Sequence, residues 1–307
     1  MSVKILTHKT AKLLRLTFDE FIDDNAIKLS ASLSYYTIFS LPPLLIIILY
    51  ICGLFFGREA VTGQFFWQIN QFVGNAAAVQ IQETIKNIEL SDSNAFAAVF
   101  GIIMLLIGAS GVFAEIQSSI NFIWGLKAKP DKGFMKFVKN RLMSFSMIAS
   151  VGFVLLVALV VNTLLDLVNG RLMLVFPEAT VLIFQVINIL LLFLITTVLF
   201  AIIFKTLPDG DIGWKDAMIG SAFTAFFFML GKFGIGYYLG ASSIATVYGA
   251  AGSVIIILVW VYYSAIILYF GAEFTKVYAK IYGKKIIPNE YAVEIVKEIF
   301  EIEPAKP

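Results

Sequence analysis

Six long apolar runs recur along the chain, and a polar stretch separates each run from the next. A helix needs about 20 apolar residues to cross the roughly 30 Å hydrocarbon core of a bilayer. The pattern therefore predicts an all-α, polytopic membrane protein with six transmembrane helices. The predicted spans cover residues 33–56, 95–123, 142–168, 180–204, 217–240 and 251–272. They form a transmembrane domain (33–273) between an N-terminal segment (1–32) and a C-terminal tail (274–307).

Several stretches outside the spans repeat apolar residues at helical spacing, which predicts short amphipathic surface helices. Residues 10–29 suit either a helix lying along the membrane surface or a soluble helix packed under the bundle. The connection over residues 57–94 predicts two short helices that rest on the bilayer or over the mouth of the bundle. Asn289, directly after Pro288, is placed to begin a last short helix that ends near Ile302. The sequence predicts no β-strands.

The distribution of lysine and arginine predicts the orientation of the bundle. Six spans place both termini on one side of the membrane. That side carries nineteen lysine and arginine residues: five in the N-terminal segment, six after the second span, two in the loop after the fourth span and six in the tail. The opposite side carries three, namely Arg58, Lys86 and Arg171. Because cytoplasmic segments of membrane proteins hold the excess of these residues, both termini are predicted to be cytoplasmic.

Composition supports the membrane class and argues against several functions. The chain is 59% hydrophobic and 14% charged, whereas about a quarter of the residues in soluble proteins are charged. It has one histidine, His8, and one cysteine, Cys52, which allows no internal disulfide. Neither metal-ligand spacing nor a paired acid and base is evident, so we expect no enzymatic activity, no metal and no cofactor. A net charge of +2 is too small to indicate binding of nucleic acid.

Lys232 is the most unusual residue of the apolar runs, because a lysine within a membrane span is unfavourable and usually marks a functional site. It lies about two-thirds of the way outward along the fifth predicted span. Asp166 lies near the outer end of the third span. Lys232 is therefore a candidate to bind an anionic headgroup, and the alternative is a structural ion pair with Asp166.

Two further carboxylates and three aromatic residues are candidate binding residues. Glu115 and Glu273 fall near the cytoplasmic ends of their spans, with Arg141 or Lys28 as possible partners. The alternative is that these carboxylates face lipid headgroups or join helices. The aromatic candidates are Tyr237, Tyr248 and Trp260, for which packing in the core or at an interface is the alternative.

Prolines and glycines are the candidate hinge residues. Pro42 and Pro43 interrupt the first span, and proline removes a backbone donor and kinks a helix. Gly231, Gly234 and Gly236 surround Lys232 and leave that helix surface with little side-chain bulk. Small residues allow close helix packing, and the alternative is local unwinding beside a cavity.

Several motifs in order resemble the YihY/BrkB family of bacterial inner-membrane proteins over roughly residues 15–282. The motifs are Leu33-Ser-Tyr-Tyr36, Phe39-Ser-Leu-Pro-Pro43, Asn121-Phe-Ile-Trp124, Leu207-Pro208, Gly231-Lys232, Tyr248-Gly249, Trp260-Val-Tyr262 and Gly271-Ala272-Glu273. The resemblance implies six transmembrane helices and an inner-membrane location, and Lys232 and Glu273 are the matched positions of most interest. The family has carried a ribonuclease label, for which these residues offer no chemistry.

Together these features lead us to expect a multi-pass inner-membrane protein that binds or transports an anionic, amphipathic envelope molecule such as a lipid. Membrane lipids are its expected partners, with a second copy of the chain or other envelope proteins as further possibilities. The alternative is a membrane scaffold or envelope assembly factor without transport activity.

Overall fold

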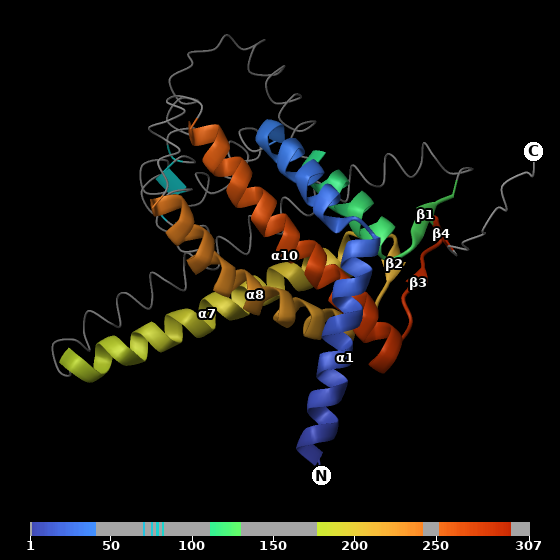
Figure 1. The fold of residues 1–307 in the computed structure, drawn as a ribbon, viewed down its shortest axis with the longest axis horizontal. Helices are drawn as coiled ribbons and strands as arrows, with labels where there is room; N and C mark the ends of the chain where they lie inside the picture. The colour runs from blue at the N-terminus through green and yellow to red at the C-terminus, as the bar shows by residue number, and fades with distance from the viewer. Residues whose placement is uncertain are drawn as a thin grey trace, which may run out of the picture.

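The computed structural model describes residues 2–40, 111–129, 177–241 and 252–295, with residues 70, 75, 78, 79 and 82 between them. Most of the described chain is helical (Figure 1). The helices are α1 (Ser2–Asp23), α7 (Pro177–Thr206), α8 (Trp214–Ala241) and α10 (Gly252–Tyr282), together with helical residues 26–40 and 111–123. Four short strands, β1 (Leu126–Ala128), β2 (Gly210–Asp211), β3 (Ile287–Pro288) and β4 (Ala292–Glu294), complete the described elements.

Three helices of the described chain are long and apolar enough to cross a membrane. They cover Val186–Thr206, Trp214–Leu239 and Val254–Tyr282, and so agree with the last three predicted spans. The first two predicted spans are helical where they are described, over residues 33–40 and 111–123. The third predicted span, 142–168, and nearly all of the connection over residues 57–94 lie outside the described residues. Pro42 and Pro43 lie outside them too.

α8 and α10 pack side by side and run antiparallel, as the pairing of their close contacts shows. A side chain at Gly220 would collide with Thr275, one at Gly271 would collide with Thr224, and one at Gly231 would collide with Tyr263. Thr224 and Thr275 are fully buried. Each hydroxyl donates to the carbonyl of the glycine one turn earlier in its own helix, at 2.7 Å to Gly220 and 2.6 Å to Gly271. Glycine thus lets the two backbones approach, which is how membrane helices associate without a hydrophobic driving force.

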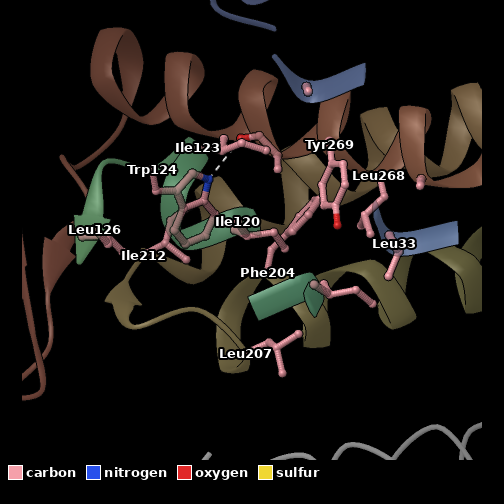
Figure 2. Close-up of a cluster of buried hydrophobic side chains, with 14 of the residues drawn as sticks. Leu33, Ile120, Ile123, Trp124, Leu126, Phe204, Leu207, Ile212, Leu268 and Tyr269 are labelled. Atoms are coloured by element: carbon pink, nitrogen blue, oxygen red, sulfur yellow. Dashed lines mark hydrogen bonds between the residues drawn. The ribbon is translucent and has the colours of Figure 1, made fainter. Parts of the chain in front are cut away.

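A cluster of buried apolar side chains joins α10 to α7 and to helical residues 111–123 (Figure 2). Ile120, Phe204 and Tyr269 are fully buried in it. The Trp124 indole nitrogen donates to the backbone carbonyl of Ala272 at 3.1 Å, so the one polar atom of this side chain is satisfied. Segments that are far apart in the sequence therefore meet around this cluster.

The short strands differ from the all-α prediction. β1 pairs antiparallel with β4, and β2 pairs antiparallel with β3. The predicted helix after Asn289 is wrong at its start, because residues 292–294 form β4. The Asn289 side chain accepts a hydrogen bond from the Tyr291 amide at 2.9 Å, and the Asn289 amide donates to the Asp209 carbonyl at 2.9 Å. Asparagine side chains form such bonds in turns as well as at the start of helices. Here the chain forms a turn and strands, because β3 and β4 pair with the distant strands β2 and β1.

α1 ends at a two-residue turn, and its buried face packs against α10. Asn25 takes a positive φ of 51° in this turn, a conformation that asparagine tolerates better than most residues. The buried side chains Leu13, Thr17 and Phe21 recur every four residues and so lie on one face. The Phe21 ring packs edge-on against Phe270 of α10, with centroids 5.6 Å apart. α1 is therefore docked on the bundle, in agreement with one of the two predicted alternatives.

Replacing Gly220 with alanine should destabilise the protein, because the new methyl group would meet the branched, fully buried Thr275 side chain. Overpacking of this kind costs about 1–3 kcal/mol. The expected result is a lower unfolding temperature of the detergent-purified protein. Gly234→Ala is the matched control in the same helix, since no atom of the described residues lies within 4 Å of a Cβ at that position. Equal unfolding temperatures for the two variants would contradict the close contact between α8 and α10.

Candidate functional site

Lys232 lies on a continuous stretch of α8, and the neighbouring glycines fall into two groups. The helix runs unbroken from Trp214 to Ala241, so the predicted unwinding near Lys232 does not occur in this structure. Gly231 is buried against Tyr263, which is the predicted packing role. Gly234 and Gly236 are different, because no atom of the described residues lies within 4 Å of a Cβ built at either position. The two helices are therefore in close contact at Gly231, whereas the α8 surface is open at Gly234 and Gly236.

The open part of α8 combines a cation with exposed aromatic rings. Lys232 is half-buried, and its ammonium nitrogen lies 5.8 Å from the centroid of the Phe233 ring. Gly236 follows Lys232 by four residues and therefore lies on the same face of the helix. Phe233 is 67% exposed and Tyr237 is 82% exposed. The arrangement offers one positive charge, open space one helical turn away, and aromatic surface beside both.

The structure places Trp260 in helix packing. Its ring lies edge-on to Phe228 of α8, with centroids 6.2 Å apart, and Phe228 packs in turn against Phe200 of α7. Phe228 precedes Lys232 by one helical turn on the same face. Trp260 thus belongs to the apolar packing around Phe228, one helical turn before Lys232 on α8. Two other candidates, Asp166 and Tyr248, lie outside the described residues.

Four charged side chains meet where α1 docks on α10, and we call them the Lys276 cluster. The ammonium nitrogen of Lys276 lies 2.8 Å from a Glu20 oxygen, 3.1 Å from an Asp24 oxygen and 2.8 Å from a Glu273 oxygen. It also donates to the backbone carbonyl of Ile123 at 2.9 Å. The cluster therefore joins α1, the turn that follows it, the end of helical residues 111–123 and α10.

The Lys276 cluster holds three carboxylates around one ammonium group in a largely buried place. Glu273 is fully buried, with 0% of its surface exposed. Its contact with Lys276 is an ion pair without hydrogen-bond alignment, and its other oxygen has no hydrogen-bond partner among the described residues. Oxygens of Glu20, Asp24 and Glu273 lie within 4.8 Å of one another, a spacing that could hold a metal ion. Lys276 contacts all three carboxylates and so takes the position in which a metal would bind.

The structure gives one boundary carboxylate a partner that the sequence analysis did not name. Glu273 pairs with Lys276, three residues further along α10. Arg141 lies outside the described residues. Glu115 lies half-buried in helical residues 111–123 and is not a member of the cluster. The spacing of Glu273 to Lys276 places both on one face of α10, and Asp24 lies in the turn four residues after Glu20. No local pattern indicated that these residues meet.

A second buried polar contact was missed by the sequence analysis. The Asn121 side chain donates to the Asp209 carboxylate at 2.8 Å and accepts from the Asp209 backbone amide at 2.7 Å. Gln117, one turn earlier, donates to the same carboxylate at 3.4 Å. These bonds hold the loop after α7 against helical residues 111–123. They give Asn121, and the Leu207-Pro208 step beside Asp209, a structural role.

Replacing Lys276 with methionine should destabilise the docking of α1, because three carboxylates would face one another without the ammonium group. Removing one partner of a buried ion pair costs about 3–5 kcal/mol, and the partial exposure of Glu20 favours the lower end. We expect a clearly lower unfolding temperature in detergent, and partial recovery when Glu273→Gln removes one of the negative charges.

Lys280→Met is the matched control, since Lys280 lies one turn further along α10 and is exposed. It should unfold at the wild-type temperature. If Lys276→Met also unfolds at that temperature, the cluster contributes no stability and the interpretation is wrong.

Comparison with known proteins places the chain among membrane proteins. The family model described as virulence factor BrkB matches residues 17–292. A UPF0761 membrane protein of Saccharophagus degradans is 26% identical over 283 residues, covering 91% of this chain and 62% of the relative. One from Alkalilimnicola ehrlichii is 26% identical and covers 85% of this chain and 57% of the relative. One from Vibrio vulnificus is 28% identical and covers 79% and 74%, respectively.

The chain thus spans about 60% of the length of the first two of these relatives. No solved structure matches it. The family match extends from α1 to the start of β4 and includes the Lys232 surface and the Lys276 cluster. The predicted resemblance is confirmed: the chain belongs to the virulence factor BrkB family and is an integral membrane protein.

Proposed function

We propose that the protein binds an anionic, amphipathic molecule of the bacterial envelope, such as a lipid, at the surface of α8 around Lys232. Transport of that molecule in the inner membrane is the activity this binding would serve. The observation that carries the proposal is a half-buried lysine within a membrane-spanning helix, one helical turn from the open space at Gly236.

The position of Lys232 supports a ligand that carries a negative charge. Lys232 follows Trp214 by 18 residues, which is about 27 Å along the helix. It therefore lies far from the end of α8 at which charged residues gather. A lysine at such a depth in a membrane-spanning helix usually marks a functional site. A headgroup phosphate or carboxylate is the kind of group that its ammonium would attract.

The surroundings of Lys232 support a ligand with an apolar part. Phe233, Tyr237 and Tyr238 are exposed large side chains, and in a membrane protein such surfaces contact acyl chains or the headgroup boundary. Gly236 leaves room for a group to lie against the backbone beside Lys232. An amphipathic molecule matches both features, because its charged end would meet Lys232 while its chains lie along the aromatic surface.

Mass spectrometry of copurifying lipids tests the proposal. Protein is extracted gently from its own membrane, and the lipids retained by wild type, Lys232→Ala and Lys215→Ala are compared. We expect one anionic lipid class to be enriched in wild type and in Lys215→Ala, and to fall to the membrane average in Lys232→Ala. Lys215 is the matched control because it is an exposed lysine near the start of the same helix.

Gly236→Leu provides a second variant that leaves the charge in place. It fills the open space beside Lys232 without meeting a neighbouring atom at its Cβ, so the protein should fold and lose the enriched lipid. Membrane-average lipid in every sample would contradict the proposal and favour the scaffold alternative. A Lys232→Ala variant that unfolds, and recovers when Asp166→Ala is added, would show instead that Lys232 is part of a structural ion pair.

A further inference from the structure

We infer that α1 has two docking faces: one holds α10, and the other lies in the headgroup layer of the membrane that the chain crosses. This interaction surface is separate from the Lys232 site and does not rest on the function proposed for it. The surface is an exposed apolar row on α1 formed by Leu14, Phe18 and Ile22, which we call the outer row.

The outer row is not needed for the docking of α1 on α10. Its side chains are spaced four residues apart and lie next to the buried face of Leu13, Thr17 and Phe21. They are nevertheless 37%, 57% and 47% exposed, respectively. Three large, exposed apolar side chains in a continuous row on one helix indicate a surface that contacts another protein or the membrane.

The contacts of α1 with α10 place the outer row at the depth of the lipid headgroups. α10 is apolar from Val254 to Ala272, and its charged residues begin at Glu273. α1 docks across this boundary, because Phe21 packs against Phe270 while Asp24 binds Lys276. Amphipathic helices bury their apolar face about 5–10 Å into the boundary between headgroups and acyl chains, which is the level at which α1 is held.

The path of α1 also suits a surface helix. In Figure 1, helical residues 26–40 lie alongside α10, whereas α1 crosses α10 obliquely and its N-terminal half extends away from the other described helices. The two-residue turn at Asp24 and Asn25 makes this change of direction. α1 thus diverges from the direction of the bundle at this turn, several residues before the first predicted span begins.

The charges of α1 favour a lipid surface as the occupant of the outer row. Arg15 lies beside the outer row with Asp19 3.9 Å away as its partner, and the exposed Lys9, Lys12 and Asp23 lie further round the helix. An apolar row bordered by a charged side is the pattern of a helix in the headgroup layer. Lys9 and Lys12 suit the anionic lipids of a cytoplasmic leaflet, the side to which the charge distribution assigns this terminus. The bilayer is already within reach, whereas a second copy of the chain would have to bring a complementary surface.

Site-specific fluorescence in the full-length protein tests the inference. Cys52→Ser provides a cysteine-free background for single cysteines at Phe18, Thr17 and Asp19, each labelled with an environment-sensitive dye. The protein is reconstituted at one copy per nanodisc, with and without a lipid that carries a shallow quencher. We expect a blue-shifted, quenched signal at position 18 and a water-like, weakly quenched signal at position 19.

Position 17 separates burial in protein from burial in lipid. Thr17 is fully buried against the bundle, so its label should be blue-shifted and protected from the lipid quencher. Identical, water-like signals at positions 18 and 19 would overturn the inference. A blue shift at position 18 without quenching by lipid would also overturn it. If that shift appeared only when two copies shared a nanodisc, it would assign the outer row to a second chain.

Discussion

The close approach of α8 and α10 is the contact on which the described structure depends. Water drives apolar surfaces together in soluble proteins, but a lipid tail is as apolar as leucine, so membrane helices need backbone proximity to associate. Gly220 and Gly271 provide it, and each receives the threonine of the opposite helix. Both threonine hydroxyls bond to their own helix, so neither is left unsatisfied at this contact. The antiparallel register of the two helices follows from these pairs.

The packing differs between the two ends of the α8–α10 pair. Towards the C-terminus of α10, the helix also holds Trp124 and the Lys276 cluster, so distant segments are joined there by buried hydrogen bonds and ion pairs. Towards the other end, contact with α8 reaches Gly231 and the open glycines follow. Lys232 lies at this transition. A closely packed end and an open position at Gly236 are compatible with the proposed binding of a ligand along α8.

Lys276 and Lys232 lie in different surroundings at the two ends of this helix pair. In the Lys276 cluster, an ammonium group with four acceptors ties four segments together, and the excess of negative charge makes each contact matter more than a surface pair would. Lys232 instead lies in a largely apolar neighbourhood with exposed aromatic rings. The surroundings of the two lysines therefore differ: carboxylates of the same protein meet Lys276, whereas exposed aromatic rings lie beside Lys232.

The sequence by itself determined that the chain is a helical membrane protein, because run length and hydropathy are local properties that a bilayer selects directly. It also indicated Lys232 and Glu273, since charge beside an apolar run stands out without knowledge of contacts. Only the tertiary structure decided that Lys276 meets Glu273 together with Glu20 and Asp24, and that Asn121 holds Asp209. It alone separated Gly231 from Gly236 and turned the residues after Asn289 into a strand. Each of these outcomes depends on which segments approach one another across long stretches of chain, and no local pattern of residue types contains that information.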